Sequence, residues 1–89
     1  MEYLELIGKP VAKREESPDF IRMVVQKRSD FMPQTLKLVV VKDKGAKVSA
    51  IIGVTKSSGF NAEVHAFRFA KKEWTNDTAN EWINNNYVS

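Results

Sequence analysis

Ser49 and His65 are the residues with which nucleophilic catalysis would have to begin in this chain. His65 is the only histidine, so it is the only imidazole available as the general base for a serine nucleophile. If the strands around them pair as a hairpin with Ser49 near Phe67, Ser49 lies diagonal to His65 on one face, roughly 7–8 Å away. That distance is too long for a direct hydrogen bond, and no third residue is placed to orient the ring. We therefore expect no protease site here, and no enzyme.

Cofactor and metal sites are not indicated either. The chain has no cysteine, which excludes thiolate metal sites and disulfides. Gly8-Lys9-Pro10 and Ser57-Ser58-Gly59 lack the spacing and the strand-to-helix context of a phosphate-binding loop. Glu15 and Glu16 have no partner carboxylate that would separate their pKa values for acid and base roles. We expect the protein to use no cofactor and no metal.

Positive charge gathers in the middle of the chain. The net charge is +3, but residues 20–72 contain eleven Lys and Arg against three Asp and Glu, and both flanking segments are acidic. On one sheet face this block would attract a polyanion such as single-stranded DNA or RNA. The alternative is that these residues simply occupy solvated and edge positions of strands, where lysine guards against aggregation. The candidate nucleic-acid contacts are Arg22, Lys37, Lys47, Lys56 and Arg68, with Phe20, Phe31 or Phe60 as stacking groups.

The elements that must position these residues are mainly strands. Alternating and β-branched runs predict strands at residues 2–8, 20–28, 35–42 and 47–56, and from 60 toward Trp74, whereas 13–17 reads as a loop. The run at 35–42 predicts a central strand covered on both faces. Asp43-Lys44-Gly45 would join it to the next strand as a hairpin. The apolar parity of the last strand changes near Ala66, which indicates either a bulge or a strand whose far end packs beneath the helix. Without a bulge Arg68 would not share a solvent face with Arg22, Lys37 and Lys47.

A short helix is predicted over residues 75–87. Thr75 can accept a backbone N–H as the N-cap, and Ala79, Trp82, Ile83 and Tyr87 recur at helical spacing as one apolar stripe. The whole chain is then one domain, 1–89, with an N-terminal segment (1–19) whose packing the pattern does not specify, a sheet (20–71) and the helix. The predicted fold is α+β, mainly β: a twisted antiparallel sheet of four or five strands, open or curled into a small barrel, with one C-terminal helix.

The C-terminal third carries a family resemblance. Phe67-Arg68-Phe69, Lys71-Lys72, Trp74-Thr75, Ala79 and Trp82 resemble a segment found in and beside bacteriophage and prophage head-maturation protease proteins, and the likeness spans roughly residues 20–87. Ala70 stands where that segment usually has Asp. The resemblance implies a viral or prophage origin and a role near capsid assembly, without protease activity. Strands followed by one helix also resemble, in architecture alone, the single-stranded-DNA-binding transcriptional-coactivator fold, which works as a dimer.

Two functions are therefore expected from the sequence. The first is a non-enzymatic small phage-type protein acting in assembly or self-association, as a homo-oligomer in the host cytoplasm or on the virion, because a chain of 89 residues has little core of its own. The second is a module that binds single-stranded DNA or RNA on a basic sheet face. No apolar run reaches the roughly 18 residues of a membrane span, so no membrane partner is expected.

Overall fold

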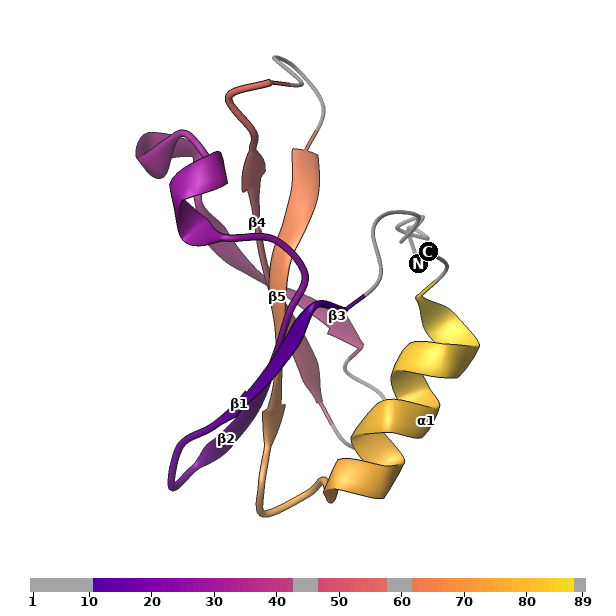
Figure 1. Ribbon diagram of the computed structural model, residues 1–89. Helices are drawn as coiled ribbons and strands as arrows, with labels where there is room; N and C mark the ends of the chain where they lie inside the picture. Colours follow the sequence, from indigo (N-terminus) through magenta and orange to yellow (C-terminus); the bar gives the residue numbers. More distant parts are fainter. Residues whose placement is uncertain (1–10, 43–46, 58–61, 88–89) are drawn as a thin grey trace.

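The protein is an open five-stranded antiparallel sheet with one C-terminal helix, which confirms the predicted α+β, mainly β class and shows that the sheet does not close into a barrel. The computed structural model describes residues 11–42, 47–57 and 62–87. The strands are β1 (Lys13–Glu16), β2 (Phe20–Val24), β3 (Lys37–Lys42), β4 (Val48–Val54) and β5 (Ala62–Ala70), in the spatial order β1-β2-β5-β4-β3. Helix α1 (Asn76–Asn86) lies against one face, and two short 3-10 turns, η1 (Arg28–Asp30) and η2 (Pro33–Thr35), follow β2 (Figure 1).

Helix α1 and the strand residues that face it form the core. Ile21 and Met23 on β2 are in register with Phe69 and Phe67 on β5, and all four are buried. From the helix, the predicted stripe of Ala79, Trp82, Ile83 and Tyr87 packs onto them. Edge-to-face ring contacts at centroid distances of 5.1–6.0 Å link Phe67 and Phe69 to Trp74, Trp82 and Tyr87. Such pairs add to the free energy of apolar burial, so the helix is held chiefly through these rings.

The predicted helix cap is confirmed. The Thr75 hydroxyl accepts a hydrogen bond from the Thr78 amide at 3.1 Å, and the Thr78 hydroxyl accepts one from the Thr75 amide at 2.9 Å. Two of the amides that a helix leaves unpaired at its start are therefore satisfied reciprocally. This capping box starts α1 at Asn76, six residues after β5 ends at Ala70.

The predicted bulge is confirmed at His65. Ile51 pairs with Ala66, but the next residue of β4, Ile52, pairs with Val64, so β5 contains one extra residue between them. On the edge of β5 that pairs with β2, the amides of Val25 and Gln26 both donate to the His65 carbonyl oxygen. Since side chains alternate along a strand, the extra residue lets Val64 and Phe67 both pack toward the core. It also turns Arg68 to the face of the sheet opposite α1. We call this face, which carries Arg22, Arg68, Ser49 and Val40, the open face.

Three sequence predictions about strands are wrong. Residues 13–16 form edge strand β1 rather than a loop, because pairing with β2 needs only the backbone and an edge position accepts charged side chains. The 35–42 segment forms an edge strand, β3, rather than a central one, and Leu38 and Val40 are more than half exposed. Strand β5 ends at Ala70 instead of continuing to Trp74, because the amides of Glu73 and Trp74 both turn back to the Ala70 carbonyl.

The predicted 20–28 strand is also shorter than expected, since β2 ends at Val24 and η1 begins at Arg28. The β3–β4 hairpin pairing is confirmed. The strand expected at residues 2–8, the turn Asp43-Lys44-Gly45 and the candidate stacking residue Phe60 lie outside the described residues.

Candidate anion-binding face

A row of five side chains crosses the open face. The strand registers place Glu15 opposite Arg22, Arg22 opposite Arg68, Arg68 opposite Ser49, and Ser49 opposite Val40. Two arginines are thus direct neighbours on adjacent strands in the middle of the sheet. Like charges in directly opposed positions repel, so this pair has to be compensated by its surroundings.

The compensation among the described residues is partial. The Arg22 Nη1 lies 3.7 Å from a Glu15 carboxylate oxygen, while the Arg68 guanidinium carbon lies 4.0 Å from the centroid of the Phe20 ring. Glu15 is itself shared with Lys13 at 3.1 Å. The Arg22 Nε is buried and has no hydrogen-bond partner in the described part of the chain, although buried N–H groups are nearly always paired.

Two hollows open at the same end of this face. One, of about 310 Å³, is lined by Phe20, Lys47, Ser49, Arg68, Ala70, Lys72 and Glu73. The other, of about 390 Å³, is lined by Pro18, Asp19, Phe20, Ala70, Lys71 and Lys72. They share Phe20, Ala70 and Lys72, and the lining of the first contains three cationic side chains against one carboxylate. The chemistry that this arrangement suits is binding of an anion with several acceptor oxygens.

The five predicted nucleic-acid contacts divide into two groups. Arg22 and Arg68 are cross-strand neighbours, and Lys47 lines the hollow beside Arg68. Lys37 is in register with Ile52 and shares its parity, so it points to the side of the sheet that α1 covers. Lys56 lies beyond the end of β4, with its amide bonded to the Asp30 carbonyl.

The predicted stacking residues divide in the same way. Phe20 lines both hollows, whereas Phe31 is fully buried. Phe31 and Leu36 pack over Gly53, where an added Cβ would lie 3.1 Å and 2.9 Å from their side-chain carbons. The segment between β2 and β3 therefore covers the end of the open face at Gly53, which we call the far end. It leaves uncovered the opposite end, which carries Lys47, Arg68 and Lys72.

Ser49 and His65 do not lie as the sequence predicted. Ser49 pairs with Arg68 instead of Phe67, so His65 is three residues farther along β5, roughly 10 Å at the usual strand rise. The imidazole is buried, with its Nδ1 at 2.6 Å from the Gln26 carbonyl oxygen and its ring 5.5 Å from Phe31. The predicted diagonal placement is wrong, because the regular ladder pairs Ser49 with Arg68 and leaves His65 as the extra residue of the bulge.

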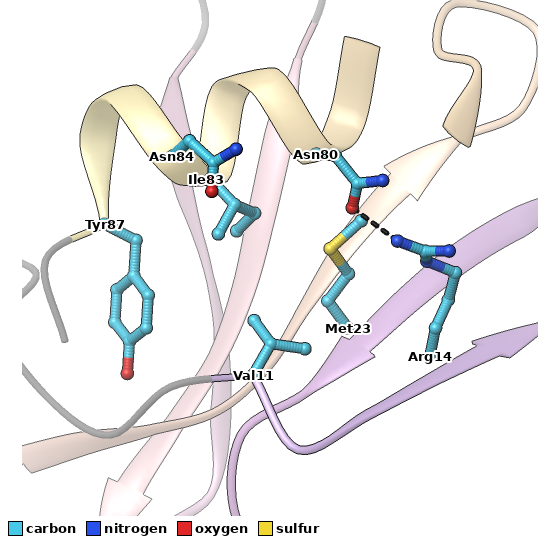
Figure 2. Close-up of a pocket in the computed structure, with 7 residues that line it drawn as sticks. All are labelled: Val11, Arg14, Met23, Asn80, Ile83, Asn84 and Tyr87. Atoms are coloured by element: carbon cyan, nitrogen blue, oxygen red, sulfur yellow. Dashed lines mark hydrogen bonds between the residues drawn. The ribbon is translucent and has the colours of Figure 1, made fainter. Parts of the chain in front are cut away.

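A third hollow, of about 430 Å³, lies between α1 and the β1–β2 hairpin and was not predicted. Figure 2 shows Val11, Met23, Ile83 and Tyr87 around its apolar part, with Arg14, Asn80 and Asn84 at its polar side, and the Arg14 guanidinium donates to the Asn80 amide oxygen. Burial, followed by the charge of Glu63, raises the pKa of the Tyr87 hydroxyl. This hollow depends on strand β1, where the sequence predicted a loop. The sequence signal for it is the alternation along residues 13–16, which puts Arg14 and Glu16 on the side of the sheet that faces α1.

No protein-family model, curated protein or solved structure matched this chain.

Two further findings concern residues 11–42, 47–57 and 62–87. Their His, Asp and Glu side chains form no group of three that could hold a metal ion. Their one α-helix is too short and too polar to span a membrane.

Proposed function

We propose that this chain is a non-enzymatic assembly protein of the phage type, which associates with copies of itself through the free edge of β3. The observation that carries the proposal is the exposure of Leu38 (54%) and Val40 (53%) on that edge strand. The resemblance of the C-terminal segment to phage head-maturation protease proteins supports the assembly role.

The two edges of the sheet differ in composition. Edge strand β1 has the sequence Lys-Arg-Glu-Glu, and its side chains form ion pairs with Arg22 and Lys71. Strand β3 has the sequence Lys-Leu-Val-Val-Val-Lys, with charges only at its ends. Proteins usually block a free edge with charged side chains, bulges or short strands. The register irregularity of β3 falls between Val40 and Lys42, which leaves Lys37–Val40 regular and able to pair.

A two-fold axis at Val39 gives a consistent pairing. In the antiparallel arrangement each Leu38 faces the Val40 of the second copy, on the open face of both chains. Since Leu38 and Val40 are already about half buried, burying the rest of each side chain contributes about 0.8–1.5 kcal/mol, half of the value for a fully exposed one. The backbone of both edges also gains hydrogen bonds. The product is a closed dimer with one continuous sheet and both helices on the same side.

Light scattering coupled to size-exclusion chromatography, over a range of concentrations, tests the proposal. We expect a concentration-dependent dimer for the wild type and a monomer for Val40→Lys, because the pairing would bury each lysine charge against the apolar Leu38 of the second copy. Ala12→Lys is the matched control: it adds the same charge at an exposed position of the opposite edge and should leave the dimer intact. A wild-type chain that stays monomeric at every concentration would contradict the proposal.

A further inference from the structure

The arginine pair, which the described residues compensate only in part, needs a physical explanation that self-association through β3 does not provide. Arg22 and Arg68 face each other across β2 and β5, and Glu15, the carboxylate within reach of Arg22, is also paired with Lys13. Within residues 11–42, 47–57 and 62–87 the buried Arg22 Nε has no hydrogen-bond partner, which adds the cost of an unmade hydrogen bond. Adjacent guanidinium groups become favourable when an anion lies between or above them.

We infer that this end of the open face binds the phosphate groups of a single-stranded nucleic acid. The hollow beside Arg68 brings together the cations Lys47, Arg68 and Lys72 and the Ser49 hydroxyl, with Glu73 as the one carboxylate in its lining. Guanidinium and ammonium donors with a hydroxyl are the groups that contact phosphate oxygens in nucleic-acid complexes.

The occupant is assigned from the extent of the site. The second hollow continues the first past Phe20 and adds Lys71, which also pairs with Glu16 at 2.9 Å, with Asp19 as the carboxylate of its lining. The cations of the two linings are therefore spread over more of the face than one free phosphate would cover. The Arg68 guanidinium lies on the Phe20 ring, and an arginine held in this way can stack a base on its other side. A single strand can bend its phosphates into recessed sites, whereas a duplex presents them on a rigid cylinder.

Fluorescence anisotropy with a labelled oligothymidine, titrated at several salt concentrations, tests the inference. Arg68→Gln should weaken binding about tenfold at low salt, and it should reduce the slope of log K against log salt by about 0.7, as expected for one lost phosphate contact on a single strand. Lys47→Gln should lower the slope in the same way. The matched controls are Arg14→Gln, which changes an exposed arginine on the helix side, and Lys56→Gln, which changes an exposed lysine at the far end; both should keep the wild-type slope.

Three results would overturn the inference. In the first, Arg14→Gln and Lys56→Gln lower the slope as much as Arg68→Gln and Lys47→Gln do, which would mean that only overall charge matters. In the second, a duplex or inorganic phosphate competes as well as the oligothymidine at equal phosphate concentration. In the third, no binding occurs at low salt. Far-UV circular dichroism melts of each variant show whether it is folded. Val40→Lys, measured in parallel, separates loss of the dimer from loss of the phosphate site.

Discussion

Replacing Trp82 by alanine should remove a large part of the stability of this fold. The indole is 8% exposed and touches Phe67 and Phe69 at centroid distances of 5.8 and 6.0 Å. A buried aromatic side chain covers roughly 150–250 Å², which at about 25 cal/mol per Å² corresponds to about 4–6 kcal/mol. Part of the cavity relaxes, so the expected loss is about 3–5 kcal/mol. A domain of this size holds only about 5–15 kcal/mol in total.

The sequence of α1 makes the helix depend on Trp82 for its stability. Five of the eleven residues from Asn76 to Asn86 are asparagine, a residue with poor helix propensity, so the helix has little stability of its own once the ring contacts are removed. We therefore expect the helix signal and the sheet signal to be lost together rather than in separate transitions.

Urea unfolding followed by far-UV circular dichroism is the appropriate assay, with the fluorescence of Trp74 as a second probe because that indole is retained. In thermal melts followed by the same circular dichroism signal, the melting temperature should fall by more than about 12 °C. Trp82→Phe keeps a ring in place and should lose less than half as much, and Glu81→Ala, on the exposed side of the helix, should be nearly neutral. A Trp82→Ala variant within about 0.5 kcal/mol of wild type would refute the conclusion that these rings hold the helix.

Three smaller perturbations test other parts of the fold. Thr75→Ala removes the hydroxyl that accepts the Thr78 amide and should cost about 1 kcal/mol in urea unfolding; an unchanged midpoint would argue against the cap. Gly53→Ala places a Cβ 3.1 Å from the buried Phe31 ring and should cost about 1–3 kcal/mol by overpacking, whereas a stabilised variant would mean that the 31–36 segment yields easily. Burial raises the pKa of Tyr87 above its ordinary value of 10.0, so the folded state holds this proton more tightly; stability should be constant below pH 10.0 and fall above it. Tyr87→Phe should lose that alkaline decline, and a decline that persists in this variant would assign it to another group.

Local patterns predicted the helix and its face correctly because each signal was contained within a few residues. Thr75 capped a stripe with a period of 3.6, and Trp82 marked its buried side. The change of apolar parity near Ala66 likewise predicted the bulge, since side-chain alternation is a property of one strand.

Strand order was not predictable in this way, because it depends on which distant segment supplies the next row of hydrogen bonds. The Leu38 to Val41 run has the composition of a central strand but lies at an edge, and the charged residues 13–16 were assigned to a loop although their backbone completes the opposite edge. For the candidate site, Arg22 and Arg68 were each identified, but their adjacency follows from the β2–β5 pairing, which joins residues far apart in the sequence.

The extra residue at His65 links the interior of this protein to its surface chemistry. Without it, the stretch after the bulge would shift by one position: Phe67 and Phe69 would turn out to solvent, and Arg68 would be driven under the helix with its charge unpaired. Deleting this one residue would thus turn the buried side chains of the second half of β5 to solvent and its outward-facing side chains to the core. Shortening a surface loop has no such effect. Variation among relatives of this chain should therefore not include loss of position 65, because that one residue keeps the hydrophobic core and the open-face Arg68 on their opposite sides of the sheet.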